Sequence, residues 1–148
     1  MYTNGIQSYR KTNVLTADPK RLVLMCYEGM IDSLNLAKQK IGEKDYEAKG
    51  KALVKAQDIL QELMNSLDFD KGGSIARSLD SLYNYMLRRM LHANLEKDIG
   101  AIDEVVEMLS TLKSAWEEIF SRKQSRVNGE PATLDNQARN QIPAYGPF

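Results

Sequence analysis

The sequence predicts an all-α protein: an antiparallel four-helix bundle with an N-terminal docking arm and a disordered C-terminal tail. Apolar residues recur at spacings of three and four along four stretches, which is the pattern of amphipathic helices. The loops between these stretches are short, so sequential helices are expected to pack as antiparallel neighbours. No segment shows the alternation of apolar and polar residues that marks a half-buried strand.

The first helix is expected to begin at Asp18-Pro19 and to end at Gly42. Aspartate is a favoured helix cap, and the fixed φ angle of proline suits the first helical position. Glycine is common at helix ends. The apolar stripe of this helix has spacings of 4, 3, 4, 3 and 4 and consists of Val23, Tyr27, Met30, Leu34, Ala37 and Ile41.

The second and third helices are separated by a turn at residues 68–73, where the pair Gly72-Gly73 breaks the apolar periodicity. Asp45 is expected to start the second helix, and Ser74 is expected to cap the third. The stripe of the second helix is Leu53, Ala56, Leu60, Leu63 and Leu67. The stripe of the third helix is Ile75, Leu79, Leu82, Met86 and Met90.

The fourth helix follows a short turn at residues 94–98. Its stripe has spacings of 3, 4, 3, 4 and 3 and consists of Ile102, Val105, Leu109, Leu112, Trp116 and Ile119. A chain of 148 residues is long enough for one domain of this kind. We therefore expect a single bundle domain that spans residues 18–120.

The two ends of the chain do not fit inside a bundle. Residues 1–17 are polar but carry spaced apolar side chains, a pattern that suits an extended arm docking into grooves. Residues 121–148 hold Gly129 and three prolines among Ser, Asn, Gln and Arg, and they lack an apolar stripe. This second segment is expected to form a flexible polar tail.

Charge and composition argue against several classes of function. Twenty basic and twenty acidic side chains leave no net charge, whereas nucleic-acid binders usually carry a basic excess. The longest apolar run, residues 22–27, is far shorter than the roughly 20 residues that cross a bilayer. Residues 1–7 lack the pattern of a signal peptide. We therefore expect a cytoplasmic protein that neither binds nucleic acid nor inserts into a membrane.

No catalytic residue, metal ligand or cofactor is expected. The single histidine, His92, has Arg89 where a di-iron bundle would need a glutamate, and a catalytic triad would need the same histidine. The segment that begins at Asp68 has the central glycine of a calcium loop but ends at Leu79 instead of a glutamate. Cys26 has no base nearby in the sequence and is interpreted as a small buried apolar residue.

Two apolar features exceed what one core needs. Residues 22–27 are six consecutive apolar residues, which cover every direction around a helix. Either the first helix is central and surrounded, or part of its apolar surface awaits a partner, and the N-terminal arm could supply that cover. Residues 83–90 combine Met, Tyr and Arg, the composition of a peptide-binding surface, although the methionines also suit a core.

Several short motifs along the chain occur in the order found in one known protein family. The first are Tyr9, residues 14–19 (Val-Leu-Thr-Ala-Asp-Pro), Leu22 and residues 25–29 (Met-Cys-Tyr-Glu-Gly). Further motifs are residues 56–63, 83–89 and 93–100 and the pair at 115 and 116. Together they resemble the flagellar secretion chaperones that bind flagellin, and the resemblance covers about residues 9–120.

The resemblance implies a cytoplasmic chaperone, not an enzyme, that binds the disordered C-terminal segment of newly made flagellin. It would prevent premature polymerisation and deliver flagellin to the flagellar export apparatus, whose gate components would be further partners. We expect recognition of an amphipathic helix in grooves of the bundle. The residues predicted to bind the partner are Ile6, Tyr9, Val14, Tyr27, Tyr83, Tyr85 and Arg88.

The arm is predicted to regulate this binding. Ile6, Tyr9 and Val14 would cover one groove until the substrate displaces them. The alternative function is a structural or signalling bundle that homodimerises through its spare apolar surface.

Overall fold

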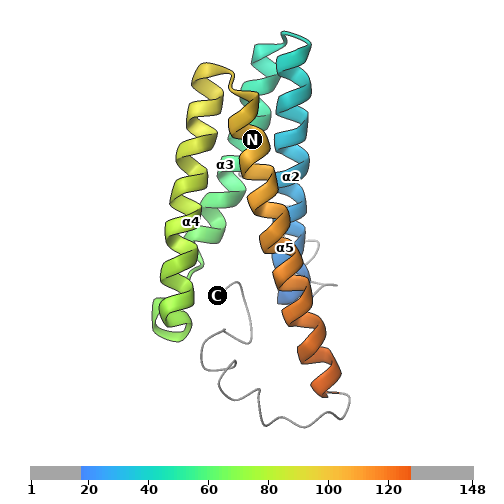
Figure 1. Cartoon of the computed structure of the whole chain (residues 1–148), viewed down its shortest axis with the longest axis vertical. Helices are drawn as coiled ribbons and strands as arrows, with labels where there is room; N and C mark the ends of the chain where they lie inside the picture. Colours follow the sequence, from blue (N-terminus) through green and yellow to red (C-terminus); the bar gives the residue numbers. More distant parts are fainter. Residues whose placement is uncertain (1–17, 128–148) are drawn as a thin grey trace.

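The computed structural model describes residues 18–127, with side chains described as far as Arg122. These residues form four helices and no strand: α2 (Pro19–Gly42), α3 (Tyr46–Asn65), α4 (Phe69–Glu96) and α5 (Ile99–Val127). Figure 1 shows the four helices side by side, each running opposite to the next in the chain. The predicted all-α, antiparallel four-helix bundle is confirmed. The predicted arm and residues 128–148 lie outside the described residues.

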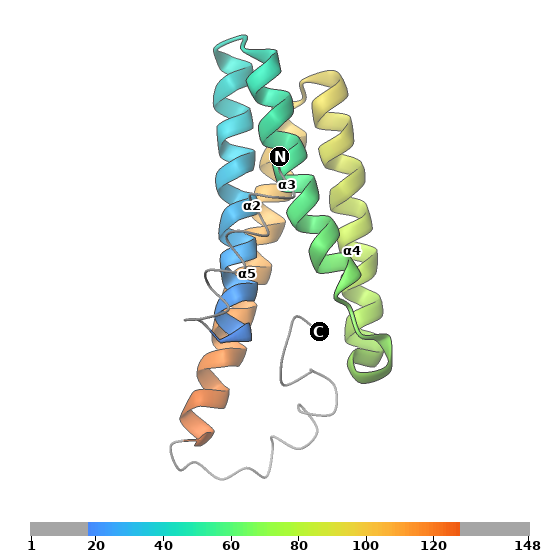
Figure 2. The ribbon, with the colours of Figure 1, turned by 180° about the vertical axis from the view of Figure 1, so that it is seen from behind.

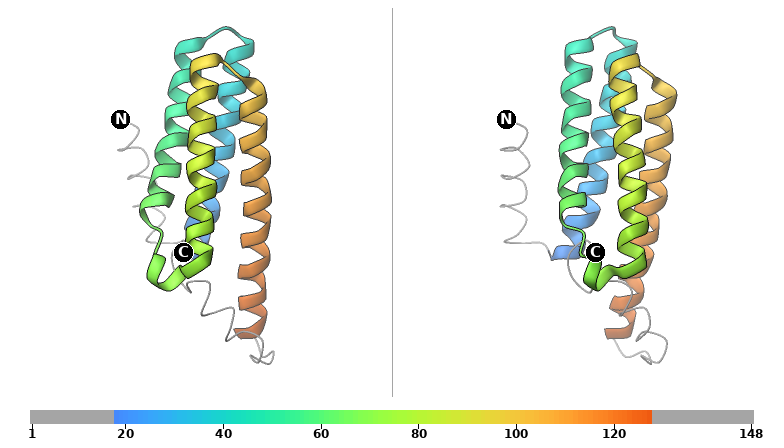
Figure 3. Two further views of the ribbon diagram at one scale, coloured as in Figure 1. Left: turned by 60° about the vertical axis from the view of Figure 1, so that its left-hand side comes forward. Right: turned by 90° about the vertical axis from the view of Figure 1, so that its left-hand side faces the viewer.

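The helices occupy the corners of a square. Helix α2 packs against α3 and α5, and α4 packs against the same two helices. The diagonal pairs, α2 with α4 and α3 with α5, have no close backbone approach in the described part of the chain. The two views in Figure 3 show this arrangement from the side. Each helix therefore has two helical neighbours and one outer face.

An aspartate precedes each of the four helices and caps it. In each case the carboxylate accepts a hydrogen bond from the backbone N–H three residues further on, at 2.9 to 3.2 Å. Such a cap satisfies a backbone donor that has no partner inside the helix, and it contributes about 1 kcal/mol. The four caps are Asp18, Asp45, Asp68 and Asp98.

The turn predicted at residues 68–73 is partly helical, which corrects the expected start of the third helix. Asp68 caps a first turn that begins at Phe69, five residues before the Ser74 cap that we expected. Gly73 then interrupts the helix, with φ +52° and ψ −127°. The glycine therefore breaks the helix as predicted, but an aspartate cap upstream favours one additional helical turn.

The core is built from the predicted stripes, with one exchange on α4. Most stripe residues are buried, and those nearer the helix ends, such as Ile41 and Ile119, are half-buried. Leu82 is 37% exposed, although we expected it in the core, whereas its neighbour Tyr83 is completely buried. A shift of one residue turns a helix by about 100°, so the rotation of α4 about its axis decides which of the two faces inward.

Helix α5 continues beyond the predicted end of the bundle. It runs to Val127, so residues 121–127 are helical and not part of an irregular tail. Figure 2 shows this last part of α5 projecting past the ends of the other helices. Among the described helices, none combines the length and the apolar character that crossing a membrane requires.

Replacing Gly73 with alanine is expected to lower the free energy of unfolding by about 1–3 kcal/mol, because a Cβ atom disfavours its backbone conformation. Apart from its chain neighbours and the nearby backbone of its own helix, no atom lies within 4 Å of the added Cβ, so the cost comes from the backbone conformation. Gly42→Ala is the matched control, since that position is equally open and has no positive φ. The control should stabilise by up to about 1 kcal/mol in chemical denaturation. Equal effects of the two substitutions would contradict the argument.

Candidate partner-binding surface

Two of the residues predicted to bind a partner lie in the centre of the core. Tyr27 on α2 and Tyr83 on α4 are both completely buried. Their hydroxyl oxygens are 2.5 Å apart and share a hydrogen bond. The indole N–H of Trp116 on α5 donates a second bond to the Tyr27 hydroxyl, at 3.1 Å. These contacts connect the diagonal pair α2 and α4, and they include α5.

The buried hydroxyls stay protonated over the whole biological pH range. Burial raises the pKa of Tyr27 to about 12, although the bonds from Tyr83 and Trp116 oppose this shift. Burial also raises the pKa of Tyr83, and the neighbouring Tyr27 adds to the effect. In the packed bundle a partner cannot reach either ring. Their predicted role in partner binding stays a prediction, and it would require the bundle to open.

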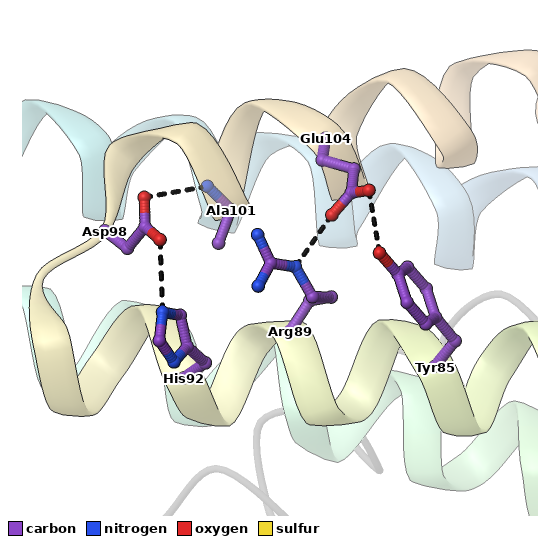
Figure 4. Close-up of polar contacts among 6 residues, drawn as sticks. All are labelled: Tyr85, Arg89, His92, Asp98, Ala101 and Glu104. Carbon is purple, nitrogen blue, oxygen red and sulfur yellow. Dashed lines mark hydrogen bonds and ion pairs between the residues drawn. The ribbon is translucent and has the colours of Figure 1, made fainter.

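The two other predicted anchors in the described residues lie together on the surface. Tyr85 is half-buried and Arg88 is exposed, and the guanidinium carbon of Arg88 lies 5.9 Å from the centre of the Tyr85 ring. Figure 4 shows Tyr85 reaching from α4 to Glu104 on α5, where its hydroxyl donates a hydrogen bond of 2.8 Å. Tyr85 therefore has one contact at its hydroxyl and one at its ring before any partner binds.

Glu104 also accepts a charged hydrogen bond from Arg89, at 2.7 Å (Figure 4). The hydrogen bond from Tyr85, followed by that from Arg89, holds the pKa of Glu104 below its ordinary value. Sequence reasoning missed this group. A signal was present, because a turn between antiparallel helices places residues at similar distances from it opposite one another. Arg89 lies five residues before the turn at 94–98, and Glu104 lies six residues after it.

The single histidine, His92, lies at the end of α4 and contacts the start of α5. His92 is exposed, and its Nε2 lies 3.1 Å from a carboxylate oxygen of Asp98 (Figure 4). The other oxygen of Asp98 caps α5 through the N–H of Ala101. The hydrogen bond from the backbone N–H of Ala101 is the main reason that the pKa of Asp98 lies below its usual range. The hydrogen bond with His92 lowers this pKa further. These contacts make His92 part of the connection between the end of α4 and the start of α5. Within residues 18–122, no cluster of histidine, cysteine or carboxylate side chains could hold a metal ion.

A buried lysine connects α3 to the end of α4. Lys49 is only 7% exposed, and its ammonium donates to the carbonyl and to the side-chain oxygen of Asn94, both at 2.8 Å. Burial, together with the nearby Lys97, lowers the pKa of Lys49. The ammonium satisfies a carbonyl near the C-terminal end of α4, where the helix dipole favours positive charge. We had not singled out Lys49 from the sequence, because a lysine in a polar stretch is ordinarily exposed.

Several large apolar side chains remain exposed on the bundle. Leu91 is 51% exposed and Leu95 is 79% exposed, one turn further along α4. Arg88 precedes Leu91 by three residues, so the three side chains share one side of the helix. The other exposed large apolar residues are Leu36, Tyr46, Phe69 and Leu82.

The apolar run on the first helix is only partly covered. Helix α2 has two helical neighbours, α3 and α5, and is therefore not surrounded in the described part of the structure. Leu24 and Cys26 pack against the edge of the core, and Leu22 and Met25 are also half-buried. Of the two interpretations of this run, the surrounded helix is excluded for residues 18–127. Ile6, Tyr9 and Val14 of the arm lie outside the described residues.

A family model for the flagellar protein FliS matches residues 2–123. The chain belongs to the FliS family. A flagellar secretion chaperone FliS of Salmonella typhimurium is 42% identical over 125 residues, which cover 80% of this chain and 93% of that protein. The corresponding Bacillus subtilis protein is 33% identical over 126 residues, covering 85% of this chain and 93% of the relative.

A third relative, the flagellar secretion chaperone FliS of Vibrio cholerae, is 35% identical over 119 residues, which cover 78% of this chain and 88% of that protein. The family resemblance that the ordered motifs indicated is therefore confirmed. The chain is a member of a family whose relatives are named flagellar secretion chaperones, and its own described residues form four helices. The family match includes all four helices down to residue 123, near the end of α5.

Removing one hydroxyl from the buried pair should destabilise the bundle. Tyr83→Phe leaves the Tyr27 hydroxyl without its bond to Tyr83, and we expect a loss of about 1–3 kcal/mol in the free energy of unfolding. Tyr46→Phe removes an equal group from an exposed ring and should cost less than about 0.5 kcal/mol. Urea denaturation of both variants would test this. Similar losses in the free energy of unfolding would show that the buried hydrogen bond stabilises the protein no more than an exposed hydroxyl does.

Glu104 should make stability depend on pH. Because its folded pKa is lowered, its stabilising contribution is complete above the unfolded pKa of about 4.3 and is lost as pH falls through the folded pKa. Glu104→Gln should therefore destabilise the protein more at pH 7 than at about pH 3. Glu107→Gln, at an exposed position on the same helix, is the control. The free energy of unfolding in urea would be measured at both pH values. An equal loss of this free energy for Glu104→Gln at both would contradict the prediction.

Proposed function

We propose that this chain is a cytoplasmic export chaperone for flagellin. It binds the disordered C-terminal segment of flagellin, prevents premature polymerisation and delivers the protein to the flagellar export apparatus. The observation that carries the proposal is the match to relatives that are named flagellar secretion chaperones, two of which are covered over 93% of their length. In this proposal, components of the export gate are a second class of partner.

The outer face of α4 supports a helix-binding mechanism. Arg88, Leu91 and Leu95 line one side of α4 at spacings of three and four, and all three are exposed. An amphipathic segment that folds on binding can place its apolar side against two such leucines. Arg88 and the fixed ring of Tyr85 lie beside them and would act as anchors, since arginine and tyrosine are enriched among residues that dominate binding energy.

The flagellin segment would become ordered when it binds the bundle, and it would be disordered before binding. Ordering a disordered chain costs part of the interaction free energy, which keeps the complex releasable at the export apparatus. The bundle itself is closed by caps and buried hydrogen bonds, so it can present its face without refolding. This difference between a rigid surface and a disordered substrate suits a carrier that must release its cargo.

The arm is proposed to compete with the substrate. Ile6, Tyr9 and Val14 would occupy part of the apolar surface in the free protein and leave it when flagellin binds. The incompletely covered apolar run on α2, where Leu22 and Met25 remain half-buried, would be a second part of the substrate-binding surface, beyond the outer face of α4, and the arm would compete there. Tyr27 and Tyr83 would contribute only if binding opened the core.

Titration with the C-terminal segment of the cognate flagellin tests the proposal. Binding measured by calorimetry should be accompanied by a gain of helix in circular dichroism. Leu91→Asp should weaken binding by about tenfold or more, because it places a charge in the apolar contact. Ser110→Asp adds the same charge at an exposed position on α5 and should change binding less than about twofold.

Absence of binding to the flagellin segment would remove the core of the proposal. The same titration with a chain that lacks residues 1–15 tests the arm. Loss of a competitor should change the affinity, in the direction of tighter binding, and an unchanged affinity would eliminate the arm hypothesis.

The alternative is a bundle that homodimerises through its exposed apolar residues. Leu91 and Leu95 would then be covered by a second copy and not by an exported protein. Sedimentation equilibrium of the free protein separates the two functions, because a tight dimer whose association is lost in Leu91→Asp would favour the alternative.

A further inference from the structure

The contact between α4 and α5 is polar at one end and apolar at the other. Tyr85 and Arg89 face α5, since both bond to Glu104. Leu82 lies three residues before Tyr85, and Ile75 lies seven residues before Leu82, so both continue the stripe that faces α5. Ile75 is nevertheless only half-buried, and Leu82 is 37% exposed.

The facing side of α5 shows the same change. Met108, Ala115 and Ile119 follow Glu104 at spacings of 4, 7 and 4, which places them on the side that faces α4. Met108 and Ile119 are half-buried, and Ala115 is exposed. Figures 1 and 2 show α4 and α5 moving apart toward this end of the bundle. We call this surface the lower α4–α5 seam: Ile75, Leu82, Met108, Ala115 and Ile119.

We propose that residues 128–148 of this chain fold back and dock on the lower α4–α5 seam. Helix α5 ends at Val127, at the end of the molecule where the two helices have separated (Figure 1). The chain therefore leaves the described structure on one of the two helices that form the seam. A segment tethered there is present at an effective concentration in the millimolar range, so even weak contacts suffice to hold it.

The length of this segment is sufficient. The contacts of Tyr85 and Arg89 with Glu104 place Leu82 near the level of Met108, which precedes Val127 by 19 residues. That separation is about 29 Å along the helix axis. The 21 residues from 128 to 148 span up to about 70 Å when extended. The segment can therefore cover the whole seam.

The composition of the segment fits an apolar surface. Residues 140–148 carry no charged side chain, and they include Ile142, Tyr145 and Phe148 at spacings of three. Pro143 and Pro147 disfavour a continuous helix, so an extended contact is the expected form. Leu134 is a further apolar residue earlier in the same segment of the sequence. The family match ends at residue 123, so this cover belongs to a part of the chain outside that match.

The proposal is tested on the free protein, without flagellin, so it stands or falls separately from the proposed function. Two-dimensional amide NMR spectra of the full chain and of a chain ending at Val127 are compared. Shift differences are expected at residues 75–82 and 108–119. Differences confined to the last turns of α5, or located on α2 and α3, would overturn the proposal.

Substitutions in the seam provide the second measurement. Leu82→Asp and Ala115→Asp in the full chain should each reproduce the loss of contact seen on truncation, and the exposed alanine tolerates the change even if Leu82→Asp impairs folding. Leu36→Asp is the matched control, because Leu36 has similar exposure but lies on α2, diagonal to α4. Shift differences that grow with protein concentration would assign the seam to a second copy and overturn intramolecular docking.

Discussion

The hydrogen bonds among Tyr27, Tyr83 and Trp116 determine how the bundle is assembled. A buried hydroxyl without a partner costs roughly 1–3 kcal/mol, so the tyrosine pair is stable inside the core only when the two hydroxyls meet. They come from helices at opposite corners, and the indole that donates to the Tyr27 hydroxyl comes from a third helix, α5. Apolar contacts alone tolerate a shift of one helix along another. This network does not, and it therefore selects one rotation and one level for α2, α4 and α5.

That rotation also decides what the surface offers. With Tyr83 pointing inward, Arg88, Leu91 and Leu95 lie on the outer side of α4, where the square arrangement provides no further helix to cover them. The same rotation directs Tyr85 and Arg89 to Glu104. The core network and the proposed binding face are thus two consequences of one orientation. A secretion chaperone of this size can keep a rigid interior and still leave apolar area available to a substrate.

The ends of the bundle differ in how they are closed. Near the α4–α5 turn, Lys49 holds Asn94, and Asp98 joins His92 to the start of α5. These contacts are polar and local, so they hold α3, α4 and α5 together at this end of the bundle without a large apolar core. At the other end α4 and α5 separate, and side chains that would complete a longer core remain partly exposed. This asymmetry is the reason that the lower seam can accept a segment of the chain itself.

Local information in the sequence determined the helices, two of their aspartate caps and nearly all of the core, because helix periodicity and capping depend on residues a few positions apart. The ordered motifs also determined the family. Tertiary structure decided which of Leu82 and Tyr83 is buried, since that choice depends on the rotation of a whole helix against its neighbours. It likewise decided the pairs Lys49–Asn94 and Tyr85–Glu104, whose members lie on different helices. Each of these pairs exists only after the helices have packed, and no spacing within one helix can reveal it.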